Sequence, residues 1–449
     1  MTTQLPAFPD IDLVHQLGST HRTTLVTPLD VEDLCRVVRE LGTAIRPSGI
    51  ACSTTVNMLA DAGYTVSLQH FKTLRMVTHD TIEIGAGVMA EELLLFLDSR
   101  QLQMGANFTF PFFRLGALSV SCYACEAYHS GQSYFSSHVI RYDIVTADGE
   151  PLVVDETQNA HLLPFLRTSV GLLGMVTSFR MRVVPNGQFG STVTLFKSPW
   201  AMLGERSTHG MRGVVGWAPY TGLTFIQQHM FEHYMMRPPY TSPGYKLFSW
   251  ALNRLASFPW RRASDLFLRL TPGSRQLMNK VQLHFKVNPN YVKLKFDDWR
   301  NRLFAWDFAE ERLPDAMKAL DKILQRYRRE HGHEIVLVGI WRFEQAPPEM
   351  RGHLHTNFDG NRQSCVLVTD HSTDRKLQEA LEAEWSAVAL SLGGRPQLQK
   401  GDYAPADFQA GFGEERIAAF RSVIYKMDPR GVFSHPQLTR LLGLSYPGA

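Results

Sequence analysis

The sequence has little cysteine and almost no net charge, and each shortage excludes a class of protein. Its 449 residues include five cysteines, an odd number without the spacing of a disulfide framework. Cys122 and Cys125 lack the second ligand pair that a zinc site needs. Lysine and arginine total 46 against 43 aspartate and glutamate residues, whereas nucleic-acid-binding domains are strongly basic. We therefore expect a reducing, cytoplasmic environment, no metal site and no nucleic-acid partner.

Long hydrophobic runs are also missing. No stretch approaches the ~18 uncharged apolar residues of a membrane-spanning helix, and residues 1–17 lack the apolar core of a signal peptide. Hydrophobic residues still make up 44% of the chain and charged residues 20%, which is typical of folded domains. The sequence predicts a protein that is soluble or at most peripheral to a membrane.

Hydrophobic periodicity predicts an α+β fold with two domains. The predicted helices are 31–41, 90–100, 314–329, 375–392 and 414–427. Strict alternation over 177–183 indicates a half-buried strand. The middle of the chain mixes helices and strands without a regular β-α repeat, which favours an antiparallel sheet covered by helices. The predicted units are an N-terminal domain over 18–187, a second domain over 188–400, and a C-terminal segment over 401–449 that returns to the first domain.

The segment 235–287 has an unusual composition. It carries nine basic residues against the single acid Asp265, interleaved with aromatic residues. The basic residues are Arg237, Lys246, Arg254, Arg261, Arg262, Arg269, Arg275, Lys280 and Lys286, and the aromatic ones include Tyr245, Phe248, Trp250, Phe258, Trp260 and Phe267. This mixture suits the entrance for an acyl or polycyclic ligand, or peripheral contact with an anionic membrane. Alternatively, the aromatic side chains form the core of the second domain.

Several short motifs follow one another in a characteristic order. They are Arg46-Pro-Ser-Gly-Ile-Ala-Cys-Ser53, Ile84-Gly-Ala-Gly87, the small-residue segment 116–131, Val145-Thr-Ala-Asp-Gly149, Ser169-Val-Gly-Leu-Leu-Gly-Met-Val176 and Arg182-Val-Val-Pro185. Together they resemble the FAD-binding domain of the vanillyl-alcohol-oxidase/PCMH flavoprotein superfamily. The segments 394–400, 428–433 and 438–441 resemble the sugar-lactone and alditol oxidase branch. A weaker similarity, through Glu126, His129 and Tyr142-Asp-Ile-Val-Thr-Ala-Asp-Gly149, links the chain to sterol Δ24-reductases.

The resemblance implies FAD as the cofactor and a set of residues around it. These residues are Arg46, Pro47, Ser48, Gly49, Ile50, Ala51, Cys52, Ser53, Gly116, Ser119, Ser121, Cys122, Glu126, His129, Gly171, Gly174 and Val176. A turn of serine and glycine can direct backbone N–H groups at a pyrophosphate. Cys52 stands where many members carry a histidine bonded to the flavin, so we expect non-covalent FAD. A thioether at Cys52 is the alternative to a small packing residue.

The resemblance also implies two residues that act at the flavin. The alditol-oxidase branch has a Glu-x-Arg pair and a downstream lysine facing the flavin, and here Arg342 and Lys400 match the arginine and the lysine. Ile340 stands where the glutamate is expected. A cation beside the flavin's N1–C2=O edge stabilises the reduced form. The alternatives are an ion pair on a strand for Arg342 and a solvated side chain for Lys400.

These residues predict an FAD-dependent oxidoreductase. The implied reaction is hydride transfer from a C–H bond, as in a CH–OH group, to flavin N5, with reoxidation by dioxygen or another acceptor. Ile340 and Trp341 in place of polar groups favour a small, lipophilic substrate. The alternatives are an NADPH-linked reductase of C=C bonds and a flavin-binding or membrane-surface protein without turnover. His353 and His355 have the spacing of one strand face but no third ligand, which argues against a metal site.

Overall fold

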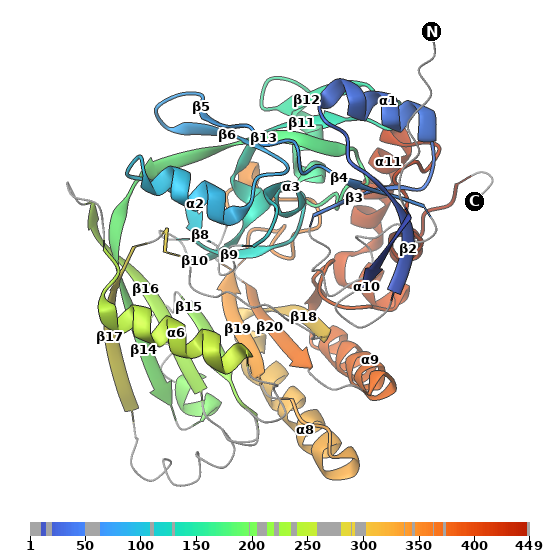
Figure 1. Cartoon of the computed structure of the whole chain (residues 1–449). Coiled ribbons are helices and arrows are strands. Elements are labelled where there is room, and N and C mark those ends of the chain that lie inside the picture. Colours follow the sequence, from blue (N-terminus) through green and yellow to red (C-terminus); the bar gives the residue numbers. More distant parts are fainter. Residues whose placement is uncertain are drawn as a thin grey trace.

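The computed structural model of the protein shows an α+β fold (Figure 1). The described residues are 10–14, 20–49, 63–107, 112–127, 131–196, 198–203, 213–219, 224–234, 240–257, 280–288, 290–291, 302–335, 337–343, 346–361, 363–370 and 374–446. In Figure 1 the N-terminal elements fill the upper part, a large sheet lies below them, and the C-terminal helices, in red, lie beside the N-terminal ones. None of the described helices is long and apolar enough to cross a membrane.

A small sheet opens the chain. Its strands are β1 (Asp10–Val14), β2 (Thr20–Val26), β3 (Ile45–Ser48) and β4 (Tyr64–Ser67), in the order β1-β2-β4-β3. Helix α1 (Val31–Leu41) connects β2 to β3 and agrees with the sequence prediction. The Asp30 side chain accepts a hydrogen bond from the Asp33 N–H at the start of α1, and Gly42, with φ of 63°, ends it. Strand β3 carries the first predicted cofactor residues.

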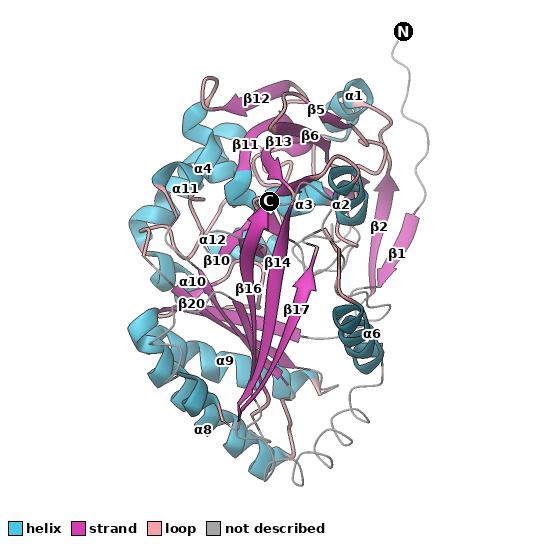
Figure 2. Ribbon diagram, turned by 90° about the vertical axis from the view of Figure 1, so that its left-hand side faces the viewer, coloured by secondary structure: helices cyan, strands magenta, loops and turns pink. Residues whose placement is uncertain are grey.

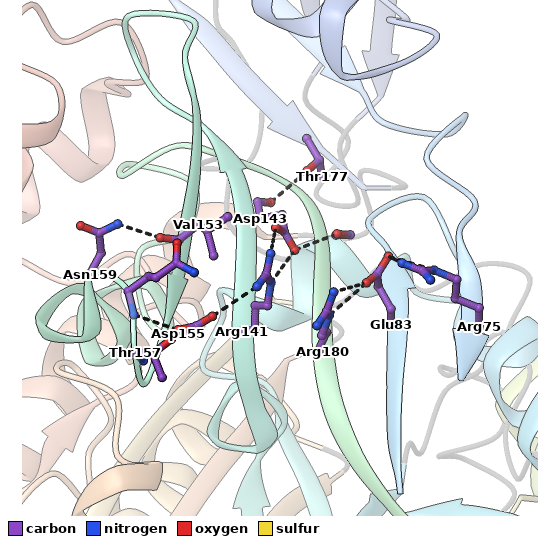
Figure 3. A network of polar contacts seen from close by, with 12 residues as sticks. Arg75, Glu83, Arg141, Asp143, Val153, Asp155, Thr157, Asn159, Thr177 and Arg180 are labelled. Atoms are coloured by element: carbon purple, nitrogen blue, oxygen red, sulfur yellow. Dashed lines mark hydrogen bonds and ion pairs between the residues drawn. The ribbon is translucent and has the colours of Figure 1, made fainter. Parts of the chain in front are cut away.

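A second sheet completes the N-terminal part. Its strands are β5 (Leu74–Met76), β6 (Thr81–Gly85), β7 (Leu102–Met104), β11 (Val139–Val145), β12 (Pro151–Asp155) and β13 (Met175–Pro185). The helices beside them are α2 (Ala90–Asp98), α3 (Leu115–Ser119) and α4 (Leu163–Leu166). The alternation predicted over 177–183 belongs to β13. Ser178 and Arg180 of this strand take part in a half-buried ladder of polar contacts with β11 and β6 (Figure 3).

The large sheet joins the middle of the chain to the N-terminal part. Its strands are β8 (Ala106–Asn107), β9 (Ala124–Ala127), β10 (Gly131–Tyr134), β14 (Gly187–Phe196), β15 (Gly213–Trp217), β16 (Thr224–Tyr234), β17 (Lys280–Val287), β18 (Arg302–Ala309), β19 (Leu337–Phe343), β20 (Gln363–Asp370) and β21 (Arg395–Pro396). Neighbouring strands from 187 onward pair antiparallel, as predicted. A parallel pairing of Gln132 in β10 with Phe343 in β19 connects this sheet to strands from the N-terminal part.

Helices cover the large sheet. Helices α8 (Leu313–His331) and α9 (Arg375–Ser391) correspond to the predicted helices 314–329 and 375–392. Helix α6 (Pro243–Ser257) was not predicted, because its apolar residues follow no simple one-sided stripe in the sequence. In Figure 2, α6 lies beside β17, away from α8 and α9.

The end of the chain packs against its beginning. After α10 (Pro405–Phe412), α11 (Glu414–Met427) and before α12 (Pro436–Leu442), the segment 428–433 reaches the small sheet. The Ile45 N–H donates to the Val432 carbonyl oxygen over 2.9 Å. Val432 and Phe433 are fully buried in the same apolar cluster as Val26 and Ile45. The contacts between these distant segments bury the strand that leads into the predicted cofactor loop.

Candidate functional site: a small-residue cleft and a lysine turn

A cleft in the N-terminal part brings five segments of the chain together. Its open volume, including space continuous with solvent, is about 470 Å³. It is lined by Pro47, Ser48, Gly49, Leu68, Ala86, Arg114, Gly116, Ala117, Val120, Val170, Gly171, Gly174 and Val176. Seven of these were selected from the sequence, namely Pro47, Ser48, Gly49, Gly116, Gly171, Gly174 and Val176. The cleft therefore collects residues from four of the six motifs, those at 46–53, 84–87, 116–131 and 169–176.

Two glycines let the walls of the cleft approach each other. Gly171 has φ of +82°, and a Cβ there would lie 2.8 Å from Cγ of Pro47. A Cβ at Gly116 would lie 2.6 Å from Cβ of Ala86. Both distances are shorter than side chains tolerate, so only glycine allows this packing. The glycines allow the segments to touch, and this contact in turn determines the shape of the cleft.

Arg114 gives the cleft its one charged lining side chain among the described residues. Its guanidinium donates to Ser67 Oγ over 3.1 Å, while its buried Nε has no hydrogen-bond partner in the described part of the chain. Burial lowers the pKa of Arg114, and the nearby Glu92 opposes this shift. A cation among small residues, without a carboxylate in the lining, suits an extended anion such as a pyrophosphate. The sequence analysis missed Arg114 because it precedes the glycine motif.

Arg46 is not a lining residue of this cleft but supports its wall. Its guanidinium is 1% exposed and donates to the carbonyl oxygens of Phe433 and Val170, each over 2.7 Å. Burial lowers the pKa of Arg46 to about 10, and Asp428 counteracts this. Arg46 therefore joins the C-terminal segment to the loop that carries Gly171. The sequence placed it at the cofactor because its motif neighbours Pro47, Ser48 and Gly49 do line the cleft.

The other predicted cofactor residues are divided between buried positions and undescribed ones. Ser119 and Ser121 are buried and donate to the carbonyl oxygens of Gly116 and Leu118, over 2.8 and 3.1 Å. Glu126 lies in β9, opposite Gln132 in β10. Ile50, Ala51, Cys52, Ser53 and His129 lie outside the described residues. The covalent state of the flavin at Cys52 is therefore a question for experiment.

Lys400 lies in a turn that touches the wall of the cleft. The Gln399 side-chain oxygen accepts a hydrogen bond from the Cys122 N–H over 2.8 Å. The Lys400 carbonyl oxygen accepts from the Ala305 N–H over 2.9 Å and from the Tyr403 hydroxyl. The Lys400 side chain is half-buried. Burial raises the pKa of the Cys365 thiol, and the positive charge of Lys400 lowers it. The turn is thus fixed beside β18 and next to the segment that follows the cleft lining.

Arg342 points to the opposite face of the sheet from Cys365. In the antiparallel pairing of β19 with β20, Trp341 lies opposite Cys365 and Arg342 lies opposite Ser364. Neighbouring residues of a strand point to opposite faces. The Arg342 Nε lies 3.8 Å from Glu310 Oε2, which also accepts from the Ser364 hydroxyl. Arg342 therefore has the strand ion pair that the sequence left open, on the face of the sheet opposite to Cys365.

A buried polar cluster lies between the two halves, and the sequence analysis missed it. Asp307 accepts hydrogen bonds from the Tyr134 hydroxyl over 3.2 Å, from the Thr356 hydroxyl, and from Gln397 Nε2 over 2.9 Å. Burial raises the pKa of Asp307 to about 6, partly offset by these hydrogen bonds. Tyr134 stacks between Phe343 and His355. The cluster connects β10 with the turn that contains Lys400.

The paired histidines do not lie on a strand. His355 is buried in a turn, where its Nε2 lies 3.0 Å from Ser136 Oγ and its Nδ1 accepts from the Gly352 N–H. Burial lowers the pKa of His355 well below its usual value. His353 bonds to the Arg416 carbonyl oxygen and stacks on Phe165. Among the described residues no group of histidine, cysteine or acidic side chains is arranged to hold a metal ion.

Comparison with known proteins identifies the class of the N-terminal part. Residues 23–155 match the family model of the FAD binding domain. No curated protein matches the sequence. The match covers the strands and turns that form most of the cleft, and the chemistry of the lining suits the pyrophosphate of the cofactor. The chain therefore binds FAD through an FAD-binding domain.

The whole fold is similar to two solved structures. They are cholesterol oxidase from Brevibacterium sterolicum and a histidine-to-alanine mutant of that enzyme. Each match has a TM-score of 0.74 and 15% identity, and covers 98% of this chain and 99% of the other. At this identity the likeness shows the fold, a PCMH-type FAD-binding domain with an α+β second domain. With the family match it supports an FAD-dependent oxidoreductase, and the sugar-lactone and alditol oxidase branch stays a prediction.

Proposed function

We propose that this protein is an FAD-dependent oxidase or dehydrogenase that removes a hydride from a C–H bond of a small, lipophilic substrate, as in a CH–OH group. The observation that carries the proposal is the contact between the cleft wall and the Lys400 turn. Gly116 and Val120 line the cleft, and two residues further on the Cys122 N–H bonds to the side chain of Gln399. The segment that follows the cleft lining and the turn that carries Lys400 are thus in contact.

Different residues of the chain would have different roles around the cofactor. FAD, when bound, would supply the hydride acceptor N5. The cleft would hold the pyrophosphate, with Arg114 contributing positive charge. Lys400 would stabilise negative charge that develops on the flavin's pyrimidine edge, because a preorganised cation in a half-buried site is effective there. Arg342 has no part in this scheme, since its ion pair with Glu310 lies on the other face of the sheet.

A lipophilic substrate is supported by apolar side chains of β19 and β20. On the face of β19 and β20 that carries Cys365, Trp341 and Leu367 are half-buried. Ile340, which stands where the resemblance expects a glutamate, is fully buried on the opposite face. Trp341 and Leu367 thus give this face apolar surface beside the fully buried Asp307, which lies opposite Cys365, whereas recognition of a polyol depends on accessible hydrogen-bonding groups.

The first test measures the cofactor. We expect the pure protein to show a flavin absorption spectrum, and denaturation by acid or heat to release all the yellow colour into the supernatant. Colour that stays with the precipitated chain would contradict the non-covalent linkage. Replacing Arg114 by glutamine should weaken FAD retention by about tenfold, the loss of one charge-assisted contact. Arg375→Gln, on the exposed side of α9, serves as the control.

The second test measures chemistry. Lys400→Met should raise the barrier to flavin reduction by about 2–4 kcal/mol and lower the flavin's reduction potential. Lys376→Met, at an exposed position of α9, should change neither. An unchanged rate and potential in Lys400→Met would show that Lys400 is a solvated side chain. Anaerobic reduction by hydrophobic alcohols, then by NADPH, and finally admission of air separates an alcohol oxidase from a C=C reductase and from a binder without turnover.

A further inference from the structure

Helix α6 has an inner face that is firmly packed. Tyr245 is 1% exposed, and its ring lies 5.6 Å from that of Phe285 in β17. Phe248 stacks on the same Phe285 ring at 5.7 Å. The Ser242 N–H, just before the helix, donates to the Lys286 carbonyl oxygen over 2.9 Å. These contacts fix the orientation of α6 on β17, and they account for two of the aromatic residues that the sequence singled out.

The outer face of α6 is apolar and exposed. Leu247 is 65% exposed and Trp250, three residues further and so on the same side, is 56% exposed. Tyr240, just before the helix, is 53% exposed, and Leu283 in β17 is 42% exposed. Leu283 shares its strand face with Phe285, the face on which α6 lies. These residues are four of the nine exposed large hydrophobic side chains among the described residues, so apolar surface is concentrated here.

The charge around this surface has one sign. Residues 240–257 and 280–288 contain Lys246, Arg254, Lys280 and Lys286 and no aspartate or glutamate. The whole segment 235–287 has nine basic residues and one acid, whereas the rest of the chain carries more acidic than basic residues. Exposed leucine and tryptophan beside lysine are the combination that binds the interface of an anionic membrane. Exposed Leu29 and Val31 stand beside the acidic residues Asp30 and Glu32 at the start of α1, so a second copy of the chain is the competing occupant that the test below distinguishes from a lipid surface.

We propose that the outer face of α6, with Tyr240 and Leu283 at its edge, docks the protein on an anionic lipid surface. Leu247 and Trp250 enter the boundary between headgroups and acyl chains, and Lys246 meets the anionic headgroups. Because the inner face of α6 stays packed on β17, docking requires no unfolding of the helix. The inference is independent of the proposed chemistry, since it concerns binding to lipid and not turnover.

The test is co-sedimentation of the purified holoprotein with vesicles. We expect binding to phosphatidylcholine vesicles that contain phosphatidylglycerol, weaker binding to phosphatidylcholine alone, and loss of part of the binding at high salt. The double variant Leu247→Ser/Trp250→Ser should reduce vesicle binding by about tenfold or more, because it removes the inserted apolar surface. Lys246→Glu should weaken binding only to the anionic vesicles.

Matched controls keep the test specific. Leu95→Ser in α2, where Leu95 is 66% exposed, removes an equally exposed leucine elsewhere, and Lys318→Glu in α8 reverses an exposed charge elsewhere. Both should bind vesicles like the unaltered protein. Bound FAD, measured by absorbance, should be the same in all variants. Absence of binding to anionic vesicles, or binding that the α6 variants leave unchanged, would overturn the proposal. The unaltered protein could instead form a dimer that binds no vesicles and that the double variant dissociates. That result would assign the surface to a second copy of the chain.

Discussion

Two polar clusters of this protein are built around carboxylates in different surroundings. The ladder on β6, β11 and β13 contains arginine and acidic side chains that are partly open to solvent (Figure 3). Glu83 pairs with Arg75 and Arg180, over 3.0 and 2.8 Å, and its side chain is 11% exposed while that of Arg75 is 61% exposed. The cluster around Asp307 is fully buried between the two halves of the molecule. Burial, and not the number of hydrogen bonds, separates the two.

The difference predicts where the protein is sensitive. In water, an ion pair on a sheet surface contributes little because solvent already satisfies both charges. At Asp307 no solvent is available, so every donor that reaches the carboxylate depends on it. Gln397, one of these donors, belongs to the turn that contains Lys400. The buried cluster therefore affects both stability and the geometry of the candidate site, whereas the ladder affects neither strongly.

The largest effect is expected for Asp307→Ala. This change leaves the Tyr134 hydroxyl, the Thr356 hydroxyl and the Gln397 amide without their buried acceptor. We expect the free energy of unfolding to fall by about 3–5 kcal/mol, as measured by urea denaturation of the FAD-loaded protein. A loss below that of an ordinary surface substitution would show that water enters the cluster and replaces the carboxylate.

The next effect is a pH dependence of stability. The pKa of Asp307 is about 6 in the folded protein, above the value of about 3.9 in an unfolded chain. A raised pKa means that the folded state binds the proton more tightly, so its stabilisation is complete below pH of about 4 and is lost as the pH rises through 6. This loss amounts to about 3 kcal/mol. Asp307→Asn should remove it, so the difference between the two unfolding curves should change with pH in this window. A constant difference would contradict the assignment.

A smaller effect is expected in the ladder. Glu83→Gln keeps the shape of the side chain but removes its charge beside Arg75 and Arg180. We expect a loss of about 1 kcal/mol or less in the free energy of unfolding. Thermal and urea denaturation should agree on the value. A loss as large as that of Asp307→Ala would show that the ion pairs of the ladder contribute as much to the free energy of unfolding as the buried cluster does.

The smallest effect is expected for a single surface pair. Arg141 Nη1 and Asp155 Oδ2 lie 3.3 Å apart with side chains 23% and 16% exposed. A double-mutant cycle of Arg141→Met and Asp155→Asn should give a coupling energy of about 0.5 kcal/mol, which salt reduces further. Arg141 also pairs with Asp143, so the single variants alone overstate the coupling. A coupling that salt leaves unchanged would contradict the solvent-screened description.

The sequence predicted the regular elements and the cofactor segments better than the individual roles. Five helices were predicted within two residues of their ends, because amphipathic spacing is a local property. Seven of the predicted cofactor residues line the cleft because their motifs are glycine-rich turns that allow close approach. Arg46 was placed at the cofactor by its neighbours in the motif, yet burial directs it to Phe433. Arg114 lies outside the motifs and was therefore not predicted.

Local sequence alone determined the periodic helices, the alternation of β13 and the order of the flavin motifs. Only the tertiary structure decided which side chains meet. Tyr134, Asp307, Thr356 and Gln397 come from distant parts of the chain, and strand pairing set the face on which Arg342 lies. The physical reason is that periodicity is encoded within one turn of helix or two residues of strand, whereas burial and pairing depend on segments brought together by the fold.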